Sequence, residues 1–138
     1  MCVLLPSGFP LNMKRLIEMQ SNIPVLEAND ISTTSSSWQK LLEFQPDPNK
    51  KCYIRGITID FNDASTFDAY IRVVINGVPI LKEYNPINTQ TKLSFGGDLV
   101  LTGKTDKPII IYVKSDGINT LVATAIITGI QISPQRSV

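Results

Sequence analysis

The stretch YIRVVINGVPILKEY, residues 70–84, constrains the fold more than any other part of the sequence. Asn76 and Gly77 separate two apolar runs. Both residue types accept the positive φ angles that a type I′ turn requires at its two central positions, so the stretch predicts a β-hairpin. Pro79 has no amide hydrogen to donate, which predicts that the second strand is short or lies at a sheet edge.

Short apolar runs separated by turn residues continue on both sides of the hairpin. We predict strands at residues 38–44, 53–61, 92–101, 108–114 and 119–132. Ile57, Ile59 and Phe61 share one face of their strand, and Gly56 stands where the alternation changes phase, which is typical of a bulge. The Gly96-Gly97-Asp98 interruption indicates either a bulged strand or a second tight turn. The last run is apolar on both faces, which favours a central, buried position.

The spacing of these runs predicts seven or eight strands after residue 33, with no helical period among them. Their short Gly, Asp, Asn and Pro turns are typical of a β-sandwich or a β-barrel. We therefore expect one β-domain over residues 34–138, and 138 residues are long enough to bury a real core.

Residues 1–33 differ from the rest of the chain. Pro6, Pro10 and Pro24 interrupt any regular pattern, while Met13, Leu16 and Ile17 have the spacing of about two turns of helix. The segment is too apolar for a solvated tail. It is expected to be an N-terminal arm with a short helix, packed on its own domain or on a neighbouring copy, and a serine-rich stretch at residues 32–37 would join it to the β-domain.

Composition argues against several classes of function. The sequence has no histidine, the side chain used most often as a general acid or base and as a metal ligand, and its two cysteines, Cys2 and Cys52, cannot form a four-sulfur zinc site. A net charge of +1 with scattered lysines and arginines argues against nucleic-acid binding. With neither a catalytic set nor a ligand set in the sequence, we expect no enzyme activity, cofactor or metal. We also expect no membrane association, because no apolar run is long enough for a signal peptide or a spanning helix.

Three apparent catalytic or binding motifs fail on their spacing or on their structural context. Residues 96–105 end like a phosphate-binding loop, but Asp98 stands where the first glycine is required and Pro108 follows where a helix should begin. Residues 60–65 resemble a calcium loop only faintly. A cluster of Asp60, Asp63 and Asp68 could hold a cation, but turn capping is the favoured role of these carboxylates. Ser37 and Lys40 have the spacing of an acylating pair but lie in a predicted strand without partner motifs.

Five aromatic residues suggest a second kind of function. Aromatic faces suit carbohydrate rings, and a sugar-stacking platform would use Trp38, Tyr53, Tyr70, Tyr84 and Tyr112. Each lies within a strand pattern, so packing is the favoured role. A carbohydrate-binding or adhesive β-sandwich, with a glycan as partner, is the alternative function.

Segments YIRGITIDF (residues 53–61) and ATAIITGIQI (residues 123–132), together with the Asn76-Gly77 hairpin, resemble small jelly-roll structural proteins of viruses. The resemblance covers about residues 34–138 and rests on strand pattern, without a diagnostic motif. Such relatives serve as pentons, turrets, decoration proteins or spike bases. The resemblance implies eight strands in two facing sheets, cyclic or lattice assembly and an N-terminal arm that contacts neighbours, and it carries over no site residue.

Taken together, pattern and resemblance predict an all-β, seven- to eight-stranded β-sandwich of jelly-roll type with an irregular N-terminal arm. We expect a non-enzymatic subunit of the virion that forms a homo-oligomer and binds other capsid proteins through protein–protein contacts; outside a virus it would be a soluble protein. The predicted partner contacts are Phe9, Leu11, Leu16, Ile17, Val25 and Leu26. Oligomer number, position in the particle, host, pairing of Cys2 with Cys52, and any bound glycan or receptor stay open.

Overall fold

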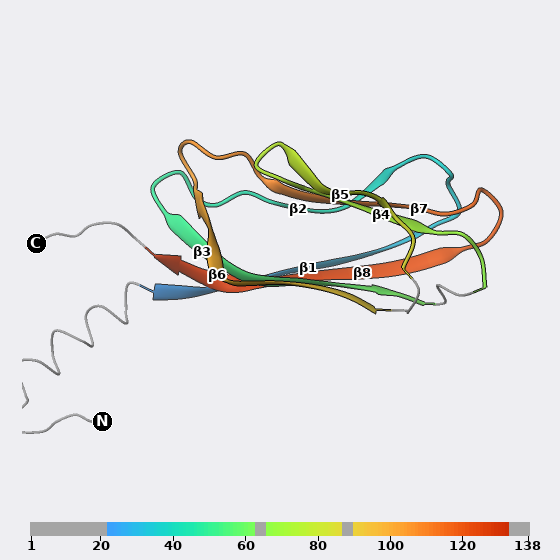
Figure 1. The fold of residues 1–138 in the computed structure, drawn as a ribbon, viewed down its shortest axis with the longest axis horizontal. Helices are drawn as coiled ribbons and strands as arrows, with labels where there is room; N and C mark the ends of the chain where they lie inside the picture. Colours follow the sequence, from blue (N-terminus) through green and yellow to red (C-terminus); the bar gives the residue numbers. More distant parts are fainter. Residues whose placement is uncertain (1–21, 63–65, 87–89, 133–138) are drawn as a thin grey trace, which may run out of the picture.

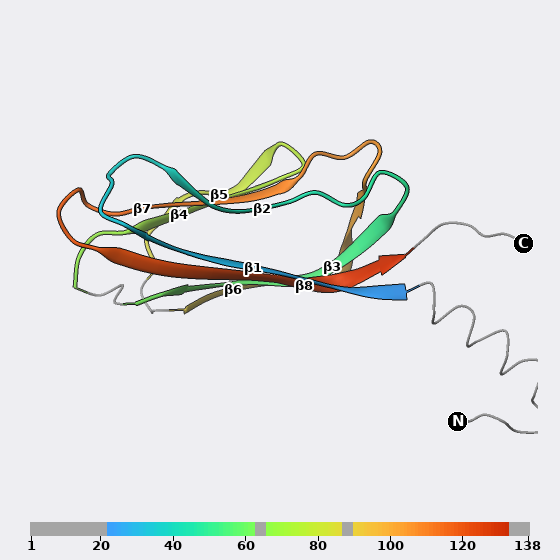
Figure 2. The same ribbon diagram turned by 180° about the vertical axis from the view of Figure 1, so that it is seen from behind.

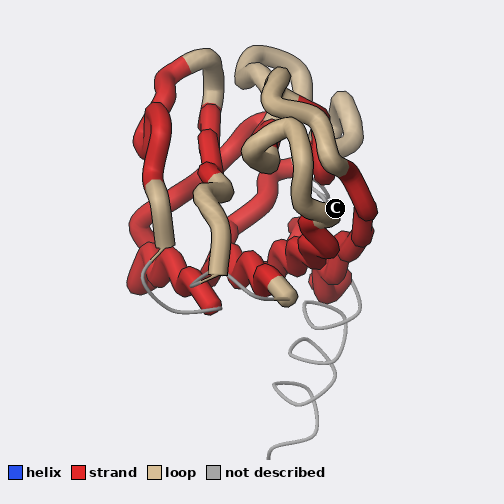
Figure 3. The backbone as a smooth tube through the Cα atoms, turned by 90° about the vertical axis from the view of Figure 1, so that its right-hand side faces the viewer, coloured by secondary structure: helices blue, strands red, loops and turns tan. Residues whose placement is uncertain are grey.

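The computed structural model describes residues 22–62, 66–86 and 90–132. This part of the chain consists of strands and loops, with no helix (Figure 3). The strands are β1 (Asn22–Thr33), β2 (Gln39–Phe44), β3 (Lys51–Phe61), β4 (Tyr70–Ile75), β5 (Val78–Tyr84), β6 (Gln90–Thr102), β7 (Ile109–Lys114) and β8 (Leu121–Ile132). The helix expected near Met13 lies outside the described residues.

The strands form two four-stranded antiparallel sheets that pack face to face (Figures 1 and 2). Sheet A has the order β1-β8-β3-β6, and sheet B has the order β2-β7-β4-β5. The predicted all-β sandwich is therefore confirmed. The two sheets approach each other most closely where β1 lies near β2.

The sequence order of the pairings shows one long hairpin folded over on itself. β4 pairs with β5, β3 with β6, β2 with β7 and β1 with β8. The pairs Ile75–Val78, Lys51–Thr102 and Asn22–Ile132 are all centred at residue 76 or 77. The Asn76-Gly77 turn is thus the tip of the whole arrangement, and this nesting of strands supports the predicted jelly-roll type.

The turn at this tip has the predicted geometry. Asn76 has a φ of 52° and Gly77 a φ of 79°, the positive values that a type I′ turn requires. β5 is an edge strand, as Pro79 predicted. The hairpin prediction is confirmed in both strands and in the turn.

The core lies between the sheets and follows the predicted alternation. In β3, Ile57, Ile59 and Phe61 are buried, and in β7 so are alternate apolar residues. The buried hydrophobic residues are Leu41, Leu42, Phe44, Cys52, Ile54, Ile57, Ile59, Phe61, Ala69, Ile71, Val73, Ile75, Leu101, Ile109, Ile111, Val113, Leu121, Ala123, Ala125 and Ile127. Most are β-branched or aliphatic, which suits close packing between two pleated surfaces.

The two glycine-containing interruptions are both bulges. The register of β3 shifts between Ile54 and Gly56 against both of its neighbours, as the change of phase predicted. β6 continues through Gly96, whose φ of 60° permits the irregularity, so this interruption is a bulged strand and not a second tight turn. Beyond these bulges the start of β3 and the end of β6 rise toward sheet B (Figures 1 and 2).

The prediction of an irregular segment up to residue 33 is wrong for residues 22–33. These residues form β1, which pairs with β8 without a register shift from Asn22 to Thr33. The apolar residues of this strand do not alternate clearly, because its inward-facing side includes Glu27 and Asn29. Tertiary pairing with β8 decides the strand, and the local sequence alone gives no such signal.

The prediction for the last strand is half right. β8 is central, since it lies between β1 and β3. Only one of its faces is buried, however: Leu121, Ala123, Ala125 and Ile127 are covered, whereas Val122 is 41% exposed. Nothing in the described residues covers the outer face of sheet A, so the apolar residues there are at the surface.

Candidate interaction surfaces

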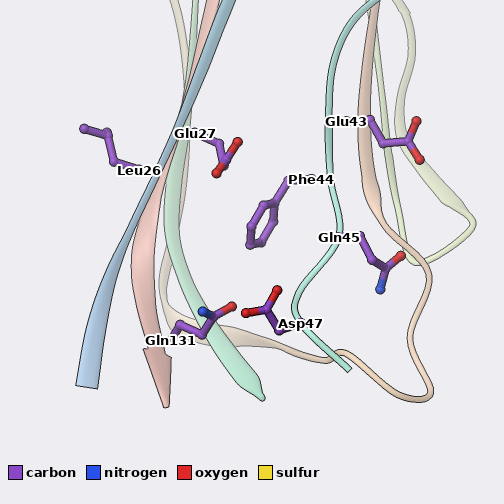
Figure 4. Close-up of a pocket in the computed structure, with 7 residues that line it drawn as sticks. All are labelled: Leu26, Glu27, Glu43, Phe44, Gln45, Asp47 and Gln131. Carbon is purple, nitrogen blue, oxygen red and sulfur yellow. The ribbon is translucent and has the colours of Figure 1, made fainter. Parts of the chain in front are cut away.

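The predicted contact residues fall into two groups. Phe9, Leu11, Leu16 and Ile17 lie outside the described residues. Val25 and Leu26 lie in β1, where Val25 pairs with Gly129 and Leu26 with Thr128. Leu26 is 69% exposed, and Figure 4 shows it on the opposite side of β1 from Glu27. Leu26 therefore belongs to the outer face of sheet A.

A row of apolar side chains crosses this outer face. Tyr53 lies between the buried Cys52 and Ile54, so it points outward. It pairs with Ile130 on one side and with Val100 on the other, and directly paired residues share a face. Val100 is 36% exposed, and the other two side chains are half-buried. The row thus presents apolar surface across three strands.

Leu26 and Ile126 extend the row on the same face. Ile126 alternates with the buried Ala125 and Ile127, so it also points outward. We call the five outward-facing residues Leu26, Tyr53, Val100, Ile126 and Ile130 the apolar end of sheet A. The sequence named Leu26 as a contact residue and Tyr53 as a candidate for sugar stacking, but it did not predict that Val100, Ile126 and Ile130 lie at the surface. The second apolar face of residues 119–132 was the signal that could have identified Ile126 and Ile130.

The other end of the same face is polar. Asp30 pairs with Thr124, Thr124 with Asp60, and Asp60 with Gln90, which makes a row of polar side chains across all four strands. The outer face of sheet A is therefore apolar at one end and polar at the other. An exposed apolar area bordered by polar residues is typical of an interaction site.

A second exposed apolar area lies at the β5 edge of sheet B. Val78 and Tyr84 pair with the buried Ile75 and Ile71 and so lie on the inner face, yet they are 59% and 40% exposed. β5 packs mainly against β4, and the exposure of Val78 and Tyr84 indicates that sheet A does not cover this edge. Pro79 and two register shifts interrupt the strand, and such features hinder pairing with another strand.

The five aromatic residues do not form one platform. Tyr53 is on the outer face of sheet A and Tyr84 on the inner face of sheet B, while the register places Tyr70 and Tyr112 on the outer face of sheet B. Trp38, just before β2, lies near Tyr70, since the Lys114 ammonium contacts both rings. The residues proposed for sugar stacking are thus divided among three faces.

Trp38 is the centre of a cluster of cations on sheet B. The Arg72 Cζ and the Lys114 Nζ each lie 4.6 Å from the centre of its ring. Lys114 also pairs with Glu83 at 2.7 Å, and this lysine holds the pKa of the Glu83 carboxyl below its usual range. The ring of Trp38 is therefore already engaged by side chains of its own sheet, which does not favour sugar stacking there.

An acidic pocket of about 380 Å³ opens between β1 and the end of β2 (Figure 4). Glu27, Phe44, Asp47 and Gln131 extend toward one another across it, and Glu43 points away. Gln131 also accepts a hydrogen bond from the Cys52 thiol at 3.2 Å. Among the described residues, no group of three or more Asp, Glu, His or Cys side chains is placed to hold a metal ion.

The residues of the apparent motifs have structural roles. Residues 96–102 continue β6, and a turn follows in which the Thr102 amide donates to the Asp106 carboxylate at 2.7 Å. Asp60 belongs to the outer face of β3, and Asp63 lies outside the described residues. Lys40 pairs with Glu43 at 2.5 Å, and this carboxylate raises the pKa of the lysine, which is the opposite of what a general base requires.

Cys52 is a buried residue of β3. Its side chain is 0% exposed, and burial raises the pKa of the thiol to about 11. A thiol is a nucleophile only as the thiolate, so the raised pKa and the burial of Cys52 both disfavour its reaction at neutral pH. Cys2 lies outside the described residues, and its pairing with Cys52 stays open.

Comparison with known proteins gives similarity in structure only. No protein-family model matches the sequence, and no curated protein matches it. No helix among the described residues is long and apolar enough to cross a membrane.

Two solved structures of phage capsids contain similar chains. A chain in the acidic stable capsid structure of Helicobacter pylori bacteriophage KHP30 has a TM-score of 0.45 and 8% identity, covering 80% of this chain and 98% of that chain. A chain in the capsid asymmetric unit of cyanophage Pam1 has a TM-score of 0.48 and 10% identity, covering 94% of this chain and 92% of that chain. Viral structural proteins are also the class that the sequence pattern resembles, but identities this low assign no function to the chain.

Proposed function

We propose that this protein is a non-enzymatic structural subunit of a virus particle, in a penton, turret or decoration position. It assembles through the outer surface of its β-sandwich and through its N-terminal arm. The observation that carries the assembly is the apolar end of sheet A, where Leu26 is 69% exposed on the same face as the half-buried Ile130 and Tyr53. Covering such apolar surface with a partner removes it from water, which stabilises the complex. The virus as the setting rests on the resemblance of the strand pattern.

The arm in this proposal is residues 1–21, since residues 22–33 form β1. Its anchors are Phe9, Leu11, Leu16 and Ile17. A deletion of residues 1–30, which the sequence alone would suggest as a test, would remove most of an edge strand. The appropriate deletion therefore ends at residue 21.

Size-exclusion chromatography with light scattering tests the proposal. The full-length protein is expected to form a homo-oligomer, and the variant without residues 1–21 is expected to be a monomer. Circular dichroism of the truncated variant serves as the control, since it should retain the β-signal of the full-length protein. A full-length protein that is monomeric at every concentration would contradict the structural role.

Particle association needs its own measurement. Mass spectrometry of purified particles is expected to detect the chain in a fixed ratio to the major capsid protein. A glycan array tests the alternative of a carbohydrate-binding or adhesive module. Specific binding of one glycan by a monomeric protein would favour the carbohydrate-binding module over the structural subunit.

A further inference from the structure

We infer that the apolar end of sheet A binds residues 1–21 of a second copy of this chain. The inference rests on the proposed function and adds to it the receiving surface and the occupant. The surface is the set of outward-facing residues Leu26, Tyr53, Val100, Ile126 and Ile130, which belong to β1, β3, β6 and β8. Leu26 is thus part of the receiving surface, and only residues before β1 belong to the arm.

The size of the surface fits one segment of chain. Strands lie about 4.8 Å apart, so four strands are roughly 15 Å wide, and three outward-facing residues along a strand cover about 14 Å. This area is a few hundred Å², well below the roughly 800 Å² per partner of a stable dimer. Two sandwiches packed only through this surface would bury too little, whereas a single extended or helical segment fits it.

The sequence of residues 1–21 has the matching chemistry. Besides Phe9, Leu11, Leu16 and Ile17, it contains Leu4 and Leu5, and Lys14 and Arg15 are its only charged residues other than Glu18. Fully extended, 21 residues reach up to roughly 70 Å, far more than the width of the sheet. The segment can therefore leave one sandwich and cross the surface of another.

The position of β1 favours a second copy over the same chain. Asn22 begins β1 opposite Ile132, at the end of the sandwich, and Pro24 already pairs with Ile130 in the apolar row. From Asn22, β1 runs inward along sheet A (Figures 1 and 2). To cover the surface of its own copy, the arm would have to reverse its direction after leaving Asn22, because β1 runs from there along the same sheet. The arm of another copy needs no such reversal.

Photo-crosslinking between isotopically distinct copies tests the inference. A mixture of unlabelled and ¹⁵N-labelled full-length protein would carry Val100→p-benzoylphenylalanine in the unlabelled copies. Because Val100 is at the surface of the edge strand β6, the new side chain does not enter the core. The matched control carries the same substitution at Gln90, which lies on the same strand and face at the polar end.

The expected result is a crosslink from position 100 to a peptide of residues 1–21 of a labelled copy, and none from position 90. Crosslinks to residues 1–21 of the same chain, to the sandwich of another copy, or to nothing in an assembled protein would overturn the inference. Light scattering on the same sample separates the two hypotheses. A monomer contradicts the proposed function as well, whereas an oligomer without the arm crosslink contradicts only the inference.

A substitution in the receiving surface gives a second, independent measurement. Leu26→Asp places a charge at a side chain that is 69% exposed, so the fold tolerates it. We expect the concentration for half-assembly to rise about tenfold or more, because the leucine no longer buries apolar surface against a partner. Ser32→Asp, at an exposed outward-facing residue of β1 beyond the polar row, should change it less than twofold. Equal effects of the two substitutions would contradict the inference.

Discussion

Asn76 and Asp106 join two turns that lie 30 residues apart in sequence: the Asn76 Nδ2 donates a hydrogen bond to the Asp106 Oδ1 at 3.3 Å. The Asn76 Oδ1 accepts a second hydrogen bond from the Lys107 amide at 2.8 Å. The other Asp106 oxygen accepts from the Thr102 amide at 2.7 Å. Asn76 thus adopts the positive φ of its own turn and also holds the turn between β6 and β7 against it.

Removal of the Asp106 carboxylate should destabilise the protein. Asp106→Ala leaves the Thr102 amide and the Asn76 side chain without their acceptor, and hydrogen bonds to a charged group contribute about 1.5–3 kcal/mol each at most. Because the carboxylate is only half-buried, we expect a decrease of about 1–2 kcal/mol in the free energy of unfolding. Urea denaturation followed by circular dichroism measures it. Lys104→Ala, at an exposed position of the same turn, is the control. An equal decrease in the free energy of unfolding for Lys104→Ala would contradict the role assigned to the Asp106 carboxylate.

Two glycines should differ widely in their tolerance of alanine. A Cβ on Gly129 would lie 2.3 Å from the Tyr53 carbonyl oxygen, so the pairing of β8 with β3 would have to shift. We expect Gly129→Ala to cost about 3 kcal/mol or more. Gly96→Ala meets nothing within 4 Å and should cost only about 1 kcal/mol for the positive φ of 60°. Thermal unfolding of both variants tests this order, and a larger loss for Gly96→Ala would contradict it.

Much of this fold could be predicted from local patterns. The Asn76-Gly77 turn requires a rare backbone conformation, so two residues were enough to locate the hairpin. The alternation in β3 and β7 identifies the inward-facing residues, because a strand between a core and solvent has a period of two. These signals are local, and therefore a single sequence contains them.

The candidate surface could not be predicted in the same way. Leu26 and Val100 are far apart in sequence, and only the pairings of β1 with β8, β8 with β3 and β3 with β6 bring them to one face. β1 itself was missed because Glu27 and Asn29 interrupt its inward-facing side. The apolar outer face of β8 was attributed to burial on both sides, since a surface strand and a buried one can have the same composition.

Acid should weaken the loop that precedes β8. The Asp116 carboxylate accepts hydrogen bonds from the amides of Ile118 at 2.8 Å and Asn119 at 2.7 Å, and these bonds lower its pKa from 3.8 to about 2. A pKa that is lower in the folded state contributes stability above pH 3.8, and this contribution is lost as the pH falls from 3.8 toward 2. The urea midpoint of the native protein should therefore decrease more over this range than that of Asp116→Asn. Parallel pH profiles for the two proteins would show that the loop makes no such contribution.

Cys52 should resist thiol reagents until the protein unfolds. Its side chain is 0% exposed, its Sγ donates a hydrogen bond to the Gln131 Oε1 at 3.2 Å, and burial raises its pKa to about 11. At pH 8 an unperturbed thiol, with a pKa of about 8.5, is partly ionised, whereas this thiol stays protonated. In a Cys2→Ser background, which leaves one cysteine, Ellman's reagent should react at least about a hundredfold more slowly with native than with urea-unfolded protein. Rapid reaction of the native protein would contradict this prediction. It would mean that β3 and β8 separate often enough to expose Cys52 to the reagent.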